Sequence, residues 1–171
     1  MASQWHSLVS QKLFLARVLL EQIGSLAKTE DDGRPVPEGE RTLRREAATQ
    51  GAIELLLRSR KLLLIMIVRL YQDRTGEPAS LNELASLVGE DPNEVVRLRE
   101  LENRANSWWN HLDQLEMSQS RPAATRKTVS TENIIAVSAD TGPDRSAAAL
   151  KDTLGALKNF TDDLEEQHSE W

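Results

Sequence analysis

The sequence predicts an all-α fold, a single helical domain over residues 1–171 with about five helices around a hydrophobic central helix. Apolar residues recur at intervals of three and four in several separate segments, which is the period of an amphipathic helix. Clusters of Gly, Pro and Asp separate these segments, and no segment requires a strand. A chain of this length also buries roughly two thirds of its unfolded surface in one domain.

We expect the first helix over residues 3–28. Its apolar face repeats at helical spacing and comprises Leu8, Leu15, Leu19, Ile23 and Leu26. The loop that follows, residues 29–39, contains one Asp-Asp-Gly and one Pro-Val-Pro sequence, and both interrupt helix and sheet.

The central helix is expected over residues 40–74, because residues 52–71 are apolar on nearly every side. One narrow polar stripe at the helical period consists of Glu54, Arg58, Lys61, Arg69 and Gln72. A helix with this surface must be surrounded by other helices, so it marks the centre of a bundle. Drawn straight, its 35 residues are about 52 Å long, whereas a compact domain of this size is about 40 Å across. We therefore expect the helix either to bend at Gly51 or to project beyond the bundle.

Capping signals predict the next two helices. The capping box Ser80-Leu81-Asn82-Glu83 starts a short helix that ends near Gly89. In Asp91-Pro92-Asn93-Glu94, Asp91 is the expected N-cap of the following helix and proline takes its first position. One seam at three- and four-residue spacing then comprises Leu98, Leu101, Ala105, Trp108, Leu112 and Leu115. We expect one helix along this seam, with Asn106 or Ser107 as the residue that would cap a restart.

The segment 119–142 is polar and predicts a long irregular tether that lies across the bundle. The apolar residues Ile134, Ile135 and Val137 are expected to hold it there. The last helix begins near Pro143 and carries a second seam, made of Ala147, Leu150, Leu154, Leu157, Leu164 and Trp171, with Phe160 at its edge.

The net charge of −6 is unevenly distributed. Residues 41–74 contain eight basic and three acidic side chains, whereas residues 75–120 contain three and nine, and residues 140–171 contain three and eight. We expect the basic central helix to pair with the acidic segments around it. The alternative is a nucleic-acid-binding surface on the 41–61 segment, which requires one exposed patch of Arg41, Arg44, Arg45, Arg58, Arg60 and Lys61.

The known catalytic templates are missing from the sequence. No cysteine is present, and there is no Gly-rich phosphate loop, nucleophile elbow or dinucleotide fingerprint. Glu165 and His168 have the spacing of one half of a di-iron site, but no second such pair accompanies them. We therefore expect no metal, no cofactor and no catalytic residue.

Arg104 and His111 are separated by six residues and resemble the catalytic motif of the helical ribonucleases of the HEPN group. In that group, arginine and histidine act on the scissile phosphate and the 2′-hydroxyl. Here the two residues are about 10 Å apart along a helix axis, and the surrounding segment is acidic, which disfavours RNA. A ribonuclease remains an alternative that requires both side chains to line a shared basic cleft, formed across a dimer.

Two tryptophans are candidates for contact with a partner. Trp108 lies on the apolar seam, so the adjacent Trp109 must point about 100° away from it. Trp109 is either buried against the tether or exposed as an aromatic anchor, the residue type most enriched at binding hot spots. Trp171, the final residue given, poses the same question.

Several short segments together resemble a gammaproteobacterial family of small helical proteins that is known only as a domain of unknown function. They are, in chain order, Gln11 to Ala16, Arg45 to Ala48 with Gly51-Ala52, Ser80 to Leu84, Ser107-Trp108 and Glu170-Trp171. The polar pair Thr49-Gln50 and the long charged loop at 29–40 depart from the family pattern. The resemblance implies a bacterial cytoplasmic protein without a known activity, so it transfers no catalytic residue.

The function expected from the sequence is therefore that of a non-enzymatic cytoplasmic interaction or scaffold protein. The longest apolar run, residues 62–68, is far shorter than the about 20 residues that span a bilayer, so no membrane association is expected. The expected partner is another protein or a second copy of the chain. Its candidate binding residues are Trp109, Trp171, Arg41, Arg44, Arg45 and Arg58. A small-molecule sensor is a further alternative that would need a cavity in the bundle.

Overall fold

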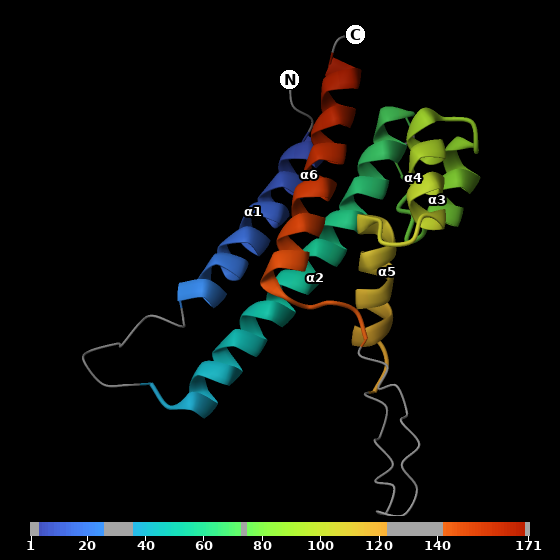
Figure 1. Ribbon diagram of the computed structural model, residues 1–171. Coiled ribbons are helices and arrows are strands. Elements are labelled where there is room, and N and C mark those ends of the chain that lie inside the picture. The colour runs from blue at the N-terminus through green and yellow to red at the C-terminus, as the bar shows by residue number, and fades with distance from the viewer. Residues whose placement is uncertain (1–3, 26–35, 73–74, 123–141, 170–171) are drawn as a thin grey trace, which may run out of the picture.

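The computed structural model describes residues 4–25, 36–72, 75–122 and 142–169. The described residues form six helices and no strand, so the predicted all-α class is confirmed (Figure 1). The helices are α1 (Gln4–Ser25), α2 (Glu38–Leu70), α3 (Leu81–Val88), α4 (Asn93–Asn103), α5 (Trp108–Gln119) and α6 (Ala147–Ser169).

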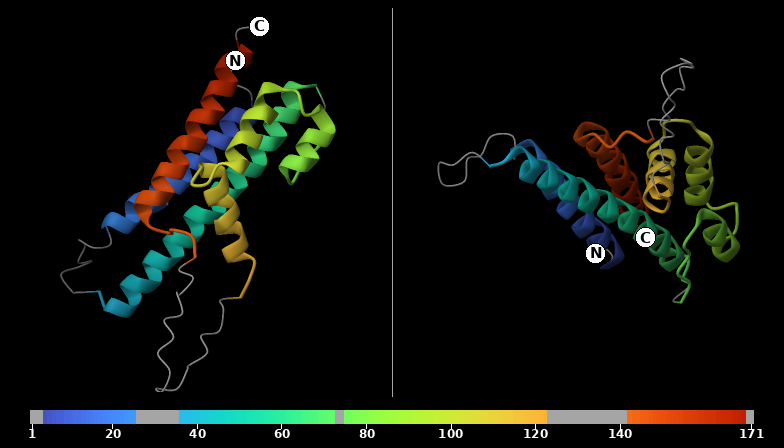
Figure 2. Two further views of the ribbon diagram at one scale, coloured as in Figure 1. Left: turned by 45° about the vertical axis from the view of Figure 1, so that its right-hand side comes forward. Right: turned by 90° about the horizontal axis from the view of Figure 1, so that it is seen from below.

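The central helix of the prediction is α2. It packs against α1, α3, α5 and α6, and its contact with α1 is the most extensive. Viewed from below, α2 lies between α1 on one side and α5 with α6 on the other (Figure 2). The short helix α4 packs on α3 and α5 at the side of this core. The last half of α2 is buried almost all round, from Leu62 to Val68, as expected for the centre of a bundle.

The length of α2 is accommodated by projection of its first turns beyond the other helices. Its helical hydrogen bonding is continuous from Glu38 to Leu70, and its first turns extend away from the other helices (Figure 1). Leu43, within these turns, is 72% exposed. Gly51 instead marks a close approach of α1, because a Cβ atom at this position would lie 2.9 Å from Cδ1 of Leu19.

The long fourth helix of the prediction is wrong, because the chain breaks between α4 and α5. Asn106 adopts a left-handed conformation with φ of 62°, which Asn tolerates better than most residues. Ser107 then caps α5, since its Oγ accepts a hydrogen bond of 3.0 Å from the backbone N–H of Asn110. Of the two residues that the sequence offered as caps, Ser107 is thus the one that caps the second helix. Ala105, which was expected on the apolar seam, is exposed.

The capping box at α3 is confirmed. The Oγ of Ser80 accepts from the backbone N–H of Glu83 at 3.2 Å, and the Glu83 carboxylate accepts from the N–H of Ala79 at 2.8 Å. The expected acidic cap of the next helix is not formed: α4 begins after Pro92, which makes no side-chain cap, and Asp91 is exposed.

The last helix begins four residues later than expected, at Ala147. Ser146 caps it, because its Oγ accepts from the N–H of Ala149 at 3.2 Å. The tether starts at Ser120, since Gln119 still belongs to α5. Most of the tether, residues 123–141, and Trp171 lie outside the described residues.

Candidate partner-binding groove

The polar stripe of α2 forms the floor of a groove between α1 and α5. Its central residues Glu54, Arg58 and Lys61 are exposed, while the partly exposed Leu55 and Leu57 lie beside them. Lys12 of α1 contributes one wall, and Glu116 and Gln119 of α5 contribute the other. The groove has a volume of about 680 Å³. We call it the α2 groove.

Arg60 lies at the α5 side of this groove and is held in place on several sides. It is only 8% exposed, and its guanidinium forms ion pairs with both Asp113 and Glu116 of α5. The same guanidinium lies 5.0 Å from the centre of the Trp109 ring, in a cation–π contact. The predicted pairing of the basic central helix with acidic flanking segments is thus present at Arg60.

Trp109 is 3% exposed, so it is not a surface anchor in this chain. Its ring packs edge-on against Trp108, with 5.6 Å between the ring centroids, and under the Arg60 guanidinium. The adjacent Trp108 packs on Phe160 of α6 at 5.7 Å. The two tryptophans therefore join α5 to two different neighbours, α2 and α6.

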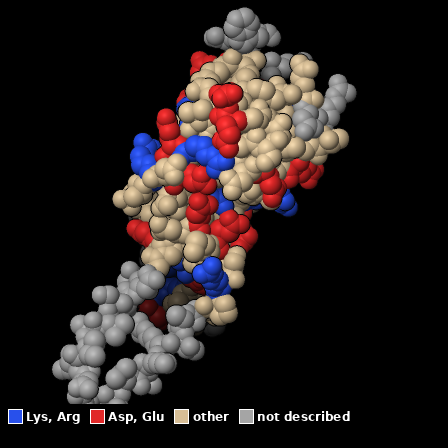
Figure 3. Space-filling model, turned by 90° about the vertical axis from the view of Figure 1, so that its right-hand side faces the viewer, with Lys and Arg blue, Asp and Glu red and all other residues tan. Residues whose placement is uncertain are grey.

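The other cations of the groove differ from Arg60. Among the described residues, Lys12, Arg58 and Lys61 make no ion pair. By contrast, two arginines of α4 are paired: Arg99 with Glu90 and Glu102, each at 3.0 Å, and Arg97 with Asp163 of α6 at 3.2 Å. On the face formed by α3, α4 and α5, basic side chains lie among acidic ones (Figure 3). The α2 groove is thus a positive site on a protein of net charge −6.

The outer surface of α1 exposes two large apolar side chains. Phe14 is 60% exposed and Leu15 is 42% exposed. The uncharged residues Ser7, Gln11, Phe14 and Val18 follow one another at helical spacing along this face. Leu15 lies one turn from Lys12 on the side of the helix that borders the groove. The exposed Leu15 therefore adjoins Lys12, whereas Phe14, two residues from Lys12, points about 200° away from it.

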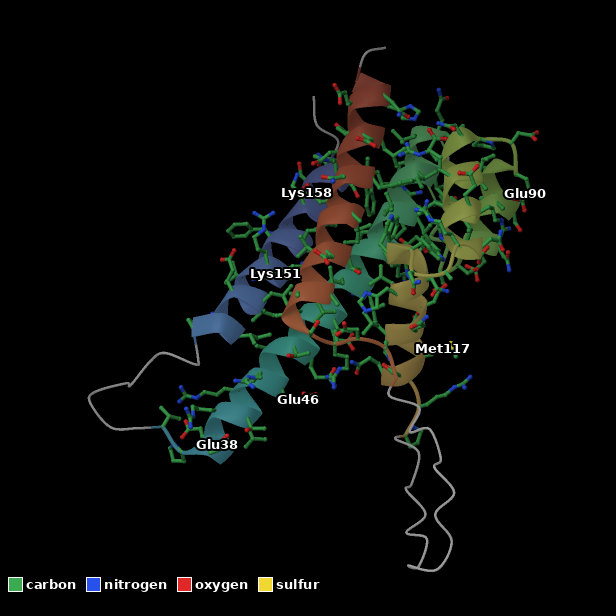
Figure 4. The ribbon with its side chains drawn as sticks, in the orientation of Figure 1. Glu38, Glu46, Glu90, Met117, Lys151 and Lys158 are labelled. Atoms are coloured by element: carbon green, nitrogen blue, oxygen red, sulfur yellow. The ribbon has the colours of Figure 1, made fainter. Side chains whose placement is uncertain are left out.

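Arg41, Arg44 and Arg45 lie apart from the groove, on the projecting turns of α2. Arg41 pairs with Glu38 at 3.3 Å, and Arg44 pairs with Glu40 at 2.5 Å; Figure 4 labels Glu38 at the start of these turns. Of the four arginines proposed as binding residues, only Arg58 lines the groove. The single exposed patch required for a nucleic-acid surface is not formed, because Arg60 is buried.

Arg104 and His111 do not share a cleft. His111 lines a hollow of about 450 Å³ between α5 and α6, and no lysine or arginine is among its described lining residues. Arg104 lines a separate hollow beside Arg99. Both ring nitrogens of His111 are occupied: Nε2 donates to the carbonyl oxygen of Asp144 at 2.7 Å, and Nδ1 pairs with the Thr153 hydroxyl at 2.6 Å. His111 joins α5 to the start of α6, and one chain does not assemble the ribonuclease pair.

Glu94 forms a buried junction that the sequence did not indicate. It is 4% exposed and accepts hydrogen bonds from the Tyr71 hydroxyl at 2.7 Å and from Nε2 of His168 at 2.9 Å. Burial raises the pKa of the Glu94 carboxyl, but the hydrogen bonds from His168 and Tyr71 outweigh it and leave the pKa below its ordinary value. The junction joins the end of α2, the start of α4 and the end of α6.

Tyr71 is the only tyrosine of the chain, so its ionisation can be followed directly. Burial, together with the hydrogen bond to the Glu94 carboxylate and its charge, raises the pKa of Tyr71 to about 12. We expect absorbance at 295 nm to show the phenol titrating well above its ordinary value of 10.0. The midpoint of the Tyr71 titration should fall toward 10.0 in Glu94→Gln. It should fall in the same way in the wild-type chain unfolded in urea. A midpoint near 10.0 in the folded wild type would contradict the junction.

His6 and Asp162 make another contact between distant segments. Nε2 of His6 donates to the Asp162 carboxylate at 2.9 Å, which joins the first turn of α1 to α6. Asp162 and the adjacent Asp163 each form a further ion pair, since Lys158 also binds Asp162 and Arg97 binds Asp163.

Within the described part of the chain, no three His, Asp or Glu side chains are grouped so that they could hold a metal ion. No helix in that part combines the length and the apolar character needed to cross a membrane.

Comparison with known proteins identifies a family and no relative of known activity. No curated protein and no solved structure matches the sequence. The profile of the Family of unknown function (DUF6586) matches residues 1–171, the whole of the sequence. This chain therefore belongs to that family of unknown function.

Proposed function

We propose that this protein is a non-enzymatic interaction protein that binds another protein across the α2 groove and the adjoining face of α1. The observation that carries the proposal is the combination of three unpaired cations, Lys12, Arg58 and Lys61, with partly exposed leucines between α1 and α5.

The composition of the surface supports this function. Depletion of charge distinguishes the core of a protein interface from other surface, and the exposed Leu15 with the partly exposed Leu55 and Leu57 supplies uncharged surface at the groove. Charged groups at the edge of such a surface steer a partner and select against others. Arg58 and Lys61 occupy this edge, since both line the groove and are exposed.

The location that we propose is the cytoplasm. The sequence contains no cysteine, which suits a reducing compartment. Fractionation of the native host with an antibody to the chain checks this location.

Charge reversal in the groove tests the function. We expect tagged wild-type protein to recover a stoichiometric protein partner from a lysate of its native host, and Arg58→Glu/Lys61→Glu to recover about tenfold less, because both unpaired cations become repulsive. The matched control is Lys151→Glu, an exposed charge reversal on α6 (Figure 4). Circular dichroism should show the same helix content for all three proteins.

Two results would contradict the function. One is full recovery of the partner by the double variant. The other is recovery of the bait alone by the wild type at moderate salt.

A further inference from the structure

We infer that the occupant of the α2 groove is an acidic amphipathic helix of a partner protein. This inference rests on the proposed function and specifies the chemistry of its partner. Such a helix would lie along the polar stripe of α2, with carboxylates toward Arg58 and Lys61 and apolar side chains toward Leu55, Leu57 and Leu15.

Helix α5 already shows how an acidic helix docks on α2. Its residues Asp113 and Glu116 are three apart, so they lie on the same face one turn from each other. Both carboxylates pair with Arg60, and the apolar Trp109 packs beneath the guanidinium. One helix face thus supplies two carboxylates and an aromatic contact to a single cation of α2.

Two of the unpaired cations, Arg58 and Lys61, lie on the exposed side of the same helix. Arg58 and Lys61 are also three residues apart, which separates them by about 4.5 Å along the axis. Two carboxylates one turn apart on a partner helix would match that spacing. Lys12, on the opposite wall, is available to a third carboxylate on the side of the partner that faces α1.

The size and the apolar surface of the groove fit a helix. The lining residues of α2 run from Glu54 to Leu64, about 15 Å along the axis or nearly three turns. Leu55 and Leu57 are partly exposed within this length, and Leu15 extends the apolar surface onto α1. Docking of an amphipathic helix in a groove of this kind is a common mode of peptide recognition.

The same lining disfavours two other occupants. Among its described lining residues the groove offers only three unpaired cations, whereas the binding of a nucleic acid depends on many cations along its phosphates. In a second copy of the chain, the carboxylates of α5 are already engaged, since Asp113 and Glu116 bind Arg60. We therefore assign the acidic helix to a partner of different sequence.

Photochemical cross-linking in the native host tests the inference on the full chain. The photoreactive residue p-benzoylphenylalanine replaces Leu15, which is 42% exposed, or in a second protein the partly exposed Leu57. The matched control places it at Leu87 of α3, which is 46% exposed and lies outside the groove. The sequence of each cross-linked peptide is then determined by mass spectrometry.

We expect both groove probes to cross-link one peptide of another protein that has an excess of Asp and Glu and apolar residues at three- and four-residue spacing. The product should be lost in the Arg58→Glu/Lys61→Glu background and should not form from position 87. A cross-linked peptide that is basic or uncharged, that comes from this chain, or that carries nucleic acid would overturn the inference.

The design separates failure of the inference from failure of the proposed function. If charge reversal abolishes partner recovery but the cross-linked peptide is not acidic, the function stands and the inference falls. If charge reversal leaves recovery unchanged and neither groove probe forms a product, both fall.

Discussion

Replacing Trp109 with alanine is expected to lower the free energy of unfolding by about 3–5 kcal/mol, the usual cost of removing a buried tryptophan. Trp109 is 3% exposed and contacts both the Trp108 ring and the Arg60 guanidinium. Its removal leaves a cavity between α2 and α5 and ends the cation–π contact. A loss of this size should lower the melting temperature by about 10 °C.

Urea unfolding followed by circular dichroism measures this loss. Trp109→Phe is the conservative comparison, because it keeps an aromatic ring under Arg60 and should cost clearly less than alanine. Leu87→Ala, at an exposed position on α3, should change stability by less than about 0.5 kcal/mol. A loss below about 1 kcal/mol for Trp109→Ala would mean that the side chain is not buried in solution, and the exposed-anchor hypothesis would then regain its support.

Replacing Glu94 with alanine is expected to destabilise the protein by about 2 kcal/mol at pH 7. The change leaves the Tyr71 hydroxyl and His168 without their shared acceptor and removes the junction between α2, α4 and α6. Both donors reach water in part, which keeps the cost below that of two fully buried groups. Glu100→Ala on the exposed side of α4 is the matched control and should be close to neutral.

The contribution of Glu94 should also depend on pH. Its carboxyl has a lowered pKa in the folded protein, so folding favours the ionised form. The stabilisation is therefore present above the ordinary pKa of 4.5 and is lost as the pH falls below it. In urea titrations, the difference between wild type and Glu94→Gln should shrink as the pH falls from 7 to below 4.5. A difference that stays constant over this range would contradict an ionised, hydrogen-bonded Glu94.

Features that depend on neighbouring residues were predictable from the sequence. Ser80 and Glu83 form the expected capping box because both partners lie within one turn of the chain. The apolar run from Leu62 to Val68 identified the centre of the bundle, since only a helix surrounded by others buries every side. The break after Asn103 was not predictable, because the apolar seam continues across it and local signals allowed both one helix and two.

The α2 groove was predictable only in part. The polar stripe containing Arg58 and Lys61 follows from helical periodicity, but its walls come from Lys12 and Glu116, which are distant in sequence. Arg60 was assigned to the same basic surface as Arg58, although two residues along a helix turn a side chain by about 200°. This rotation directs Arg60 toward Asp113 and Trp109 and leaves Arg58 exposed.

The sequence by itself determined that this protein is all-α, that its second helix is central, and that the chain contains no familiar catalytic motif. Only the tertiary structure decided which charges are paired and which remain available. Arg60 and Glu94 acquire their partners from residues 53 and 74 positions away, whereas Lys12, Arg58 and Lys61 form no ion pair within the described residues. The physical reason is that helix formation is governed by local spacing, while burial and ion pairing depend on how whole helices pack.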